Sequence, residues 1–259
     1  MQISRFPALP ALPAGSTAFI GDFDGVHAAH RAMLRDPLER RGWVIAVHQP
    51  ASVRSNRINR LSGVARGLAH AGVNALVIAS SRTPMNTITN QLEDVRRAIE
   101  IVPVQSMNAT AATIREAIGD GNVLQAQHLL GGHPEIEGRI ANGDKRGRTI
   151  GFATANIHLG PLVSPKHGVY AVRALIQGTD TWVDGVANMG IRPTFGGKPP
   201  VLEAHLFDFK QDIYGKSVRI RLIDIIRPEK KFDGIDALKA QIARDCDTAR
   251  ECLANAGPQ

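Results

Sequence analysis

Aromatic residues, cysteines and long apolar runs are all scarce in this sequence. Aromatic side chains make up only 5% of the 259 residues, and no zinc-finger, RNP or helix-turn-helix pattern occurs, so nucleic acid is not expected as a partner. The two cysteines, Cys246 and Cys252, lie in one expected helix and point to different faces. This placement excludes a disulfide scaffold and a structural zinc.

A membrane span and a signal peptide are not expected either. The sequence contains no stretch of about 20 mainly apolar residues, which is the length that a spanning helix needs. The opening segment MQISRFPALPALPAGS carries prolines where a signal peptide needs an uninterrupted apolar core. A cytoplasmic protein with no membrane contact is therefore predicted.

The composition that remains is typical of a folded protein with an excess of basic residues. Hydrophobic residues are 43% and charged residues 21% of the chain, which are ordinary globular values, and the length suits one large or two modest domains. The 31 lysines and arginines outnumber the 24 acidic residues, giving a net charge of +7, which suggests an anionic ligand. The sharpest basic cluster lies among glycines and suits a small polyphosphate better than a long polymer. It comprises Arg139, Lys145, Arg146 and Arg148.

The first half of the chain alternates short apolar runs with helical patterns. One run ends at Ile20, and two more cover Trp43 to Val47 and Asn74 to Ala79, with helices expected between them. Strands that alternate with helices predict a parallel sheet of the doubly wound α/β type. Ser80 to Asn90 is expected to be a loop, and Asn108 to Gly132 is expected to form two short helices.

After Gly131-Gly132-His133-Pro134 the hydrophobic period changes from 3.6 to 2, which predicts a domain boundary. The expected division is a tail at 1–15, an α/β domain at 16–132 and a second domain at 133–259. The second domain has strand-like runs and one closing helical stripe, and a small antiparallel β-barrel with a C-terminal helix is expected. The expected strands are Gly168 to Ile176, Trp182 to Met189, Val201 to Phe209 and Val218 to Ile226.

Three stretches of the second domain carry residues that suit chemistry. The glycine-rich segment from Gly138 to Arg148 can cradle phosphate through backbone N–H groups, or it can be a basic turn between two strands. Thr154 and Asn156 are two residues apart on one strand face and are either a polar site or a satisfied core pair. Glu203 faces away from Leu202, Ala204 and Leu206, and is either a solvated outer residue or a placed general base.

Together these stretches resemble one family. The segments GRTIGFATANI, GVANMGIRPTFGG, LEAHLFDFKQDIYGK and IRPEKKFDGIDALKAQIARD occur in this order. They are similar to the riboflavin kinase module of the bacterial bifunctional riboflavin kinase and FAD synthetase family. The resemblance implies a riboflavin kinase-like barrel that transfers the γ-phosphate of ATP to the 5′-hydroxyl of riboflavin, giving FMN and ADP.

The resemblance also implies roles for individual residues. Thr154 would ligate Mg²⁺ through its hydroxyl, and Asn156 would help to hold the metal and the phosphates. Glu203 would accept the proton of the attacking hydroxyl. A flap over ATP would run through the segment that contains Gly138, Gly143, Lys145, Gly147, Arg148 and Gly151. Ala153 departs from the family, which usually has proline there, and this loss is expected to loosen the strand before Thr154.

The N-terminal segment GDFDGVHAAH, residues 21–30, resembles the nucleotidyltransferase signature of the same family. The resemblance implies a nucleotidyltransferase-like, Rossmann-like domain in which His27 and His30 would stabilise charge on ATP phosphates. Ala29 replaces a glycine of the signature and adds a methyl group where the nucleotide must approach. The family's central Gly-Asp-Phe-Arg-Phe-Gly type segment has no match, and its paired serines are replaced at Thr110-Ala111.

Three functions are compatible with these features. The first is a riboflavin kinase whose FAD synthetase-like domain has degenerated to a scaffold, and the second is a bifunctional enzyme that still forms FAD. The third is a flavin-binding or regulatory protein without turnover, which the change at Ala153 would favour. A metal site at His27 and His30 is a further reading, but it lacks an evident third ligand.

Overall fold

The computed structural model describes residues 1–38, 42–50, 56–95, 100–104, 108–141, 152–190 and 200–257. The chain forms two compact units. One comprises Met1–Thr113 with Leu129–Gly131, and the other comprises Ile114–His128 with Gly132–Gln259. The change of hydrophobic period at Gly132 coincides with one of these limits, and the division into domains at residue 132 remains a proposal.

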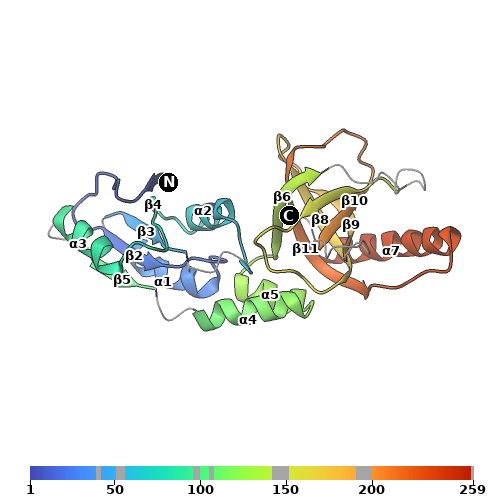
Figure 1. Ribbon diagram of the computed structural model, residues 1–259, viewed down its shortest axis with the longest axis horizontal. Helices are drawn as coiled ribbons and strands as arrows, with labels where there is room; N and C mark the ends of the chain where they lie inside the picture. The colour runs from blue at the N-terminus through green and yellow to red at the C-terminus, as the bar shows by residue number, and fades with distance from the viewer. Residues whose placement is uncertain are drawn as a thin grey trace. The chain divides into compact units, whose positions relative to one another are not determined.

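The first unit is built on a five-stranded parallel sheet with the strand order β1-β4-β3-β2-β5 (Figure 1). The strands are β1 Gln2–Arg5, β2 Thr17–Gly21, β3 Val44–His48, β4 Ala75–Ile78 and β5 Glu100–Pro103. Three helices, α1 Ala28–Leu38, α2 Leu61–His70 and α3 Met85–Val95, alternate with them. The doubly wound α/β architecture expected from the sequence is therefore confirmed.

Helices cover both faces of this sheet. Leu34 of α1 and Leu68 of α2 pack with Phe19 and Ala46 on one face, whereas Ile88 and Leu92 of α3 pack on the other face. The inner strands β2, β3 and β4 are buried on both sides because each face is covered, which is why they read as continuous apolar runs in the sequence.

The expectation of a loop from Ser80 to Asn90 is wrong, because α3 begins at Met85 within that range. Met85, Ile88 and Leu92 recur at helical spacing and pack into the core of the sheet. Threonines and asparagines occupy the positions between them, and their low helix propensity hid the pattern. Residues 1–15, expected to be a tail, contribute the edge strand β1, whose Ile3 pairs with Leu76.

The second unit contains a closed antiparallel barrel with the order β10-β7-β6-β11-β8-β9. Its strands are β6 Glu135–Ala141, β7 Ala155–His158, β8 Gly168–Ile176, β9 Val183–Gly190, β10 Val201–Leu206 and β11 Ser217–Pro228. One face of each strand fills the barrel with apolar side chains, including Tyr170, Leu202 and Ile220. The expected small barrel is confirmed.

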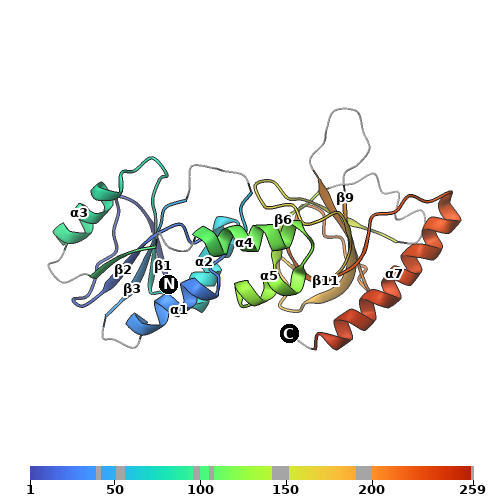
Figure 2. The same cartoon turned by 90° about the horizontal axis from the view of Figure 1, so that it is seen from below.

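The C-terminal helix α7, Ile235–Asn255, lies along the outside of the barrel (Figure 2). Its buried stripe, with Cys246, Ala249 and Leu253, packs on Val169, Ala171 and Val186 of the barrel wall. Both cysteines of the chain are free, as their spacing predicted. The part of this outer wall that α7 leaves uncovered is where the candidate site lies.

Two short helices precede the barrel, α4 Asn108–Gly119 and α5 Val123–Leu130, as the sequence predicted. The backbone of Lys166 donates a hydrogen bond to the carbonyl of Ile118 (3.2 Å) and so ties the end of α4 to the barrel unit. Gly121, between the two helices, has φ +75° and lies against Lys166 and Ile225, so a side chain there would be strained and crowded.

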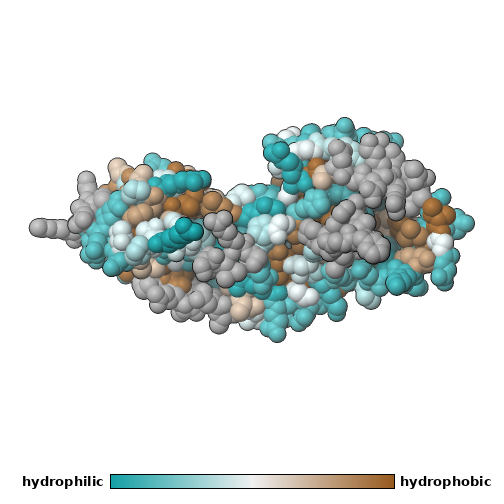
Figure 3. Space-filling model, viewed as in Figure 1, coloured by the Kyte–Doolittle hydropathy of each residue, from teal (hydrophilic) through white to brown (hydrophobic). Residues whose placement is uncertain are grey.

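No helix within the described ranges is long and apolar enough to cross a membrane. On the face drawn in Figure 3, hydrophobic residues are interspersed with hydrophilic ones. The large apolar side chains that are exposed come from the N-terminal end and from three separate helices; they are Met1, Ile3, Leu61, Leu124 and Ile235. Scattered apolar residues of this kind are normal on a folded protein and mark no site by themselves.

Candidate active site and the closed signature

The three barrel residues that the sequence singled out share the outer face of the wall. Thr154 directly precedes β7, Asn156 lies within β7, and Glu203 lies in β10. The alternating neighbours Ile157, Leu202 and Ala204 point into the barrel core, which leaves the polar residues on the opposite face. Glu203 pairs directly with Asn156 in the antiparallel register of β10 and β7.

Thr154 and Glu203 line one cavity of about 350 Å³. Its walls combine the barrel face with the end of β11 and with α7. Most of its lining surface is apolar, and several of the lining side chains are polar or charged. The lining residues used below are Phe152, Asn188, Glu203, Glu229, Phe232 and Ile242. A mainly apolar cavity with a few convergent polar groups is the usual form of a small-molecule site.

A second cavity, of about 190 Å³, borders the same segment at Thr154. It is lined by Thr154, Tyr214 and a polar turn that includes Lys210 and Asp212. Thr154 and His205 belong to the lining of both cavities. Thr154 therefore lies at the boundary between the two cavities.

His205 fixes the segment before β7. Its Nδ1 lies 2.8 Å from the carbonyl oxygen of Ala153, and because a carbonyl only accepts, this nitrogen carries the proton. The imidazole also packs edge-on against Phe152, with ring centroids 5.4 Å apart. These contacts hold the backbone at the position where the family usually has proline, so the expected loosening at Ala153 is opposed by a hydrogen bond that the sequence did not reveal.

A buried ion pair closes the wall of the larger cavity. The guanidinium of Arg227, at the end of β11, makes two hydrogen bonds to the carboxylate of Asp245 on α7, at 2.8 and 2.7 Å. Gln241 donates a third hydrogen bond to the same carboxylate, at 2.9 Å. Asp245 is only 5% exposed, so these bonds lock α7 to the strand end in a setting where a bidentate pair is strong.

The glycine-rich segment expected to form the flap is only partly described. Gly138 lies inside β6, where a Cβ would come within 2.6 Å of the Ile157 side chain, so glycine permits close packing of β6 on β7. Gly143, Lys145, Gly147, Arg148 and Gly151 lie outside the described residues. Their roles at ATP stay predictions.

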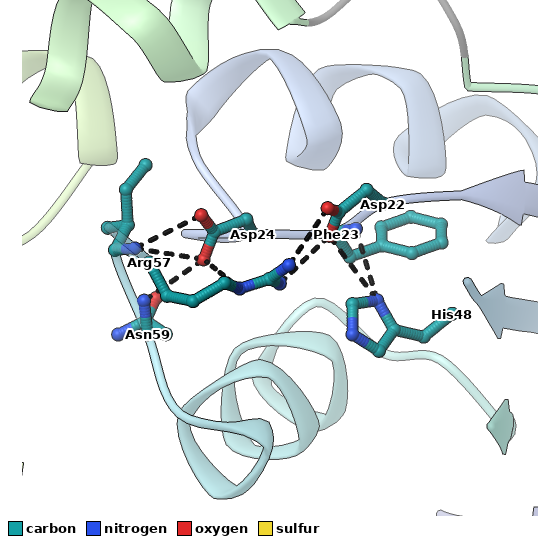
Figure 4. A network of polar contacts seen from close by, with 7 residues as sticks. Asp22, Phe23, Asp24, His48, Arg57 and Asn59 are labelled. Carbon is teal, nitrogen blue, oxygen red and sulfur yellow. Dashed lines mark hydrogen bonds and ion pairs between the residues drawn. The ribbon is translucent and has the colours of Figure 1, made fainter. Parts of the chain in front are cut away.

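The signature of the first unit lies at the end of β2. Gly25 adopts φ +91°, which favours glycine, and the turn leads into α1. Figure 4 shows the guanidinium of Arg57 between two carboxylates of this signature. It donates hydrogen bonds to both oxygens of Asp22, at 3.0 and 2.9 Å, and its Nε lies 3.4 Å from Asp24.

Asp24 is almost fully buried and accepts further hydrogen bonds from the same segment. The backbone N–H of Ile58 lies 3.0 Å from both carboxylate oxygens, and that of Asn59 lies 3.1 Å from one of them. The two carboxylates of the signature are therefore engaged by residues 57–59 in this structure. Nothing in the sequence pattern pointed to Arg57, because its partners are more than thirty positions away.

The paired histidines of the signature are buried rather than open to a ligand. His27 is 0% and His30 is 1% exposed, with ring centroids 3.9 Å apart. Burial, together with the neighbouring His27, lowers the pKa of His30 from 6.5 to about 3, so its ring is neutral near pH 7. Ala29, between them, is partly exposed. A phosphate cannot reach either imidazole in this conformation.

His48, the last residue of β3, also belongs to this network. Its Nδ1 accepts a hydrogen bond from the backbone N–H of Phe23, at 3.2 Å, as drawn in Figure 4. Burial lowers the pKa of His48, which agrees with an unprotonated accepting nitrogen. Across the described part of the chain, no group of three His, Cys, Asp or Glu side chains is arranged to hold a metal ion.

Comparison with known proteins identifies the family. The family model described as riboflavin kinase matches residues 130–253. A bifunctional riboflavin kinase/FMN adenylyltransferase from Escherichia coli K12 is 35% identical over 291 aligned positions, covering 92% of each chain. These positions exceed the 259 residues of the present chain, so the relative carries segments that this chain lacks.

Two further similarities support this result. The relative of the same name from Haemophilus influenzae is 47% identical over 146 residues, covering 56% of this chain and 46% of its own. A crystal structure from Streptococcus pneumoniae, described as a macrolide-efflux protein, superposes with a TM-score of 0.76 at 27% identity, covering 92% of this chain and 94% of that chain. The chain belongs to the bifunctional riboflavin kinase/FMN adenylyltransferase family and carries its riboflavin kinase domain.

Proposed function

We propose that the barrel unit is a riboflavin kinase, which transfers the γ-phosphate of Mg-ATP to the 5′-hydroxyl of riboflavin. The observation that carries this proposal is the position of Thr154 at the lining of two cavities, one of which also contains Glu203. Phosphoryl transfer needs a nucleophile and a phosphate donor brought into line from two sides, and positioning supplies most of the rate.

The larger cavity suits the flavin. Phe152, Phe232 and Ile242 provide apolar surface for a flat tricyclic ring, and Glu203 lies in the same lining to receive the ribityl chain. The smaller cavity, with Lys210 and other polar groups, suits the nucleotide. The two substrates would then meet at Thr154.

Glu203 is the general base in this proposal. The hydroxyl oxygen of riboflavin forms a bond to the γ-phosphorus while the bond from that phosphorus to the β–γ bridging oxygen breaks, and ADP leaves. The proton of the hydroxyl passes to the Glu203 carboxylate, which also orients the nucleophile.

Thr154 and Asn156 fit a magnesium ion. Their side chains offer a hydroxyl and an amide oxygen on one face of the wall, and Mg²⁺ prefers oxygen ligands and completes its shell with phosphates and water. The ion would neutralise charge on the transferred phosphate.

The proposal extends to the first unit, which we expect to have no adenylyl transfer activity. The buried, neutral His30 and the engagement of Asp22 and Asp24 by residues 57–59 support this view. The relatives are named for both activities, riboflavin kinase and FMN adenylyltransferase. The alternative to our proposal is therefore that this chain also forms FAD.

Substitution of Thr154 tests the kinase proposal. Purified full-length protein is incubated with riboflavin, ATP and Mg²⁺, and the flavins are separated by chromatography over time. FMN should accumulate, Thr154→Ala should slow its formation about 100-fold, and Thr154→Ser, which keeps the hydroxyl, should restore most of the rate. Equal rates of FMN formation for Thr154→Ala and Thr154→Ser would show that the hydroxyl has no part in the mechanism. Tight binding of riboflavin without formation of FMN would favour a flavin-binding protein without turnover.

A further inference from the structure

A row of polar side chains crosses three neighbouring strands of the barrel wall. Glu203 of β10 pairs directly with Asn156 of β7 on one side and with Asn188 of β9 on the other. The residues before and after Asn188, which are Ala187 and Met189, point into the barrel core. Asn188 therefore faces outward beside Glu203, and the two residues line the same cavity.

The register brings Asn188 within reach of the Glu203 carboxylate. Directly opposed residues of antiparallel strands have Cβ atoms about 4.5–5.5 Å apart, a span that an asparagine and a glutamate side chain bridge. The amide nitrogen of asparagine has two hydrogens to donate. The sequence assigned a role to Asn156 through the family resemblance and none to Asn188.

The other side of Asn188 meets a second carboxylate. A Cβ atom built on Gly190 would collide with Oε1 of Glu229 and would lie 3.2 Å from Nδ2 of Asn188. The space over Gly190 is therefore shared by the Glu229 carboxylate and the Asn188 amide, and only glycine leaves room for both. Glu229, which directly follows β11, lines the cavity as well, so Asn188 has Glu203 beside it on the neighbouring strand and the Glu229 carboxylate near its own amide.

We propose that Asn188 is a positioning residue for the kinase reaction, whose side-chain amide orients the Glu203 carboxylate and separates it from the Glu229 carboxylate. The inference rests on the proposed function, because it gives Glu203 the role of base. Without the amide, two carboxylates share one cavity with no neutral donor between them, and Glu203 loses the contact that aims it at the ribityl hydroxyl.

A double-mutant cycle tests this role. Full-length Asn188→Ala, Glu203→Gln and the double variant are assayed for kcat, and riboflavin affinity is followed by flavin fluorescence. Asn188→Ala should lower kcat about tenfold with riboflavin affinity unchanged within about twofold, and it should add less than about twofold in the Glu203→Gln background. The proposal would be overturned if the losses in kcat of the two single variants multiplied in the double variant. It would also be overturned if Asn188→Ala weakened riboflavin binding.

Two matched variants separate orientation from packing. Asn188→Asp keeps the size and shape of the side chain but replaces the amide donor with a third carboxylate. Its kcat should therefore be lower than that of Asn188→Ala. Full activity of Asn188→Asp would contradict the positioning role. Asp184→Asn lies on the outer face of the same strand, 49% exposed and outside the cavity lining, and should keep the original kcat. If Glu203→Gln itself keeps full turnover, the proposed base is wrong. If Glu203→Gln lowers kcat but the Asn188 variants leave it unchanged, only the positioning role of Asn188 fails.

Discussion

In the barrel unit, Thr154 and Glu203 lie on an outer strand face and line an open cavity. In the sheet unit, Asp22 and Asp24 are bonded to residues 57–59, and His27 and His30 are buried. Both units contain polar residues of a family motif in the expected local setting. The difference teaches that a motif in the expected local setting does not by itself keep its polar atoms accessible to a ligand.

The two units also use arginine differently. Arg227 binds Asp245 at the edge of the larger cavity and so supports its wall, whereas Arg57 lies between the two signature carboxylates. In the first case both partners of the ion pair belong to the lining of a cavity. In the second case the pair occupies the polar groups that a ligand would need.

The largest expected effect is on the barrel site. Glu203→Gln keeps the size of the side chain but removes the base, and kinase turnover should fall about 100-fold to 10,000-fold. Steady-state kinetics of the purified variant measures it, with the thermal unfolding midpoint as a check that the fold is intact. Turnover within about twofold of the original would mean that the carboxylate has no part in the reaction.

The next effect concerns the wall of the cavity. Asp245→Ala leaves the Arg227 guanidinium without its partner in a largely buried position, and the barrel unit should lose about 3 kcal/mol of unfolding free energy. Chemical denaturation followed by circular dichroism measures the loss. Asp247→Ala, on the same helix but 75% exposed, should change stability by less than about 0.5 kcal/mol; similar losses for both would contradict the assignment.

A smaller loss is expected in the sheet unit. Arg57→Met leaves Asp22 and Asp24 without the guanidinium between them, and local stability should fall by about 2 kcal/mol. Hydrogen exchange of residues 17–24 should accelerate while kinase turnover stays unchanged. Arg82→Met, at an exposed position of the same unit, serves as the control, and equal exchange in both variants would show that the network does not stabilise the signature.

The last effect is a pH dependence of the sheet unit, which is the smallest when counted per pH unit. Because the pKa of His30 is about 3 when folded and 6.5 when exposed, the unfolded chain takes up a proton below pH 6.5 that the folded unit excludes. Stability is therefore full above pH 6.5 and falls by up to about 1.4 kcal/mol per pH unit as the pH drops toward 3. Hydrogen exchange of the signature between pH 7 and 5 measures it. His30→Leu should flatten the dependence, and an unchanged slope would exclude His30 as its source.

Much of the fold could be predicted because hydrophobic period is local. The apolar run of β8, the alternation in β11 and the stripe of α7 are readable from neighbouring residues, and the observed β8 matches the predicted strand from Gly168 to Ile176. Helix α3 was missed because threonine and asparagine weakened its local signal. The doubly wound sheet followed from the order of strands and helices alone.

The site could be predicted only in part. Alternation placed Thr154, Asn156 and Glu203 on strand faces, and the family resemblance gave them roles. The pairing of Asn188 with Glu203 depends on the register of β9 and β10, and the contact of Arg57 with Asp22 joins residues 35 positions apart. Neither is fixed by local pattern, since both arise only when distant segments pack.

The comparison of the accessible barrel site with the buried signature of the sheet unit is tested most directly with ATP labelled at one of two phosphates. Full-length protein is given riboflavin and Mg²⁺ with ATP labelled at either the γ- or the α-phosphate, and the flavins are separated. We expect the γ label to pass into FMN and the α label to remain in the adenine nucleotides. An α label in FAD would show that the signature of the sheet unit opens and works, and a γ label that never reaches FMN would refute the kinase.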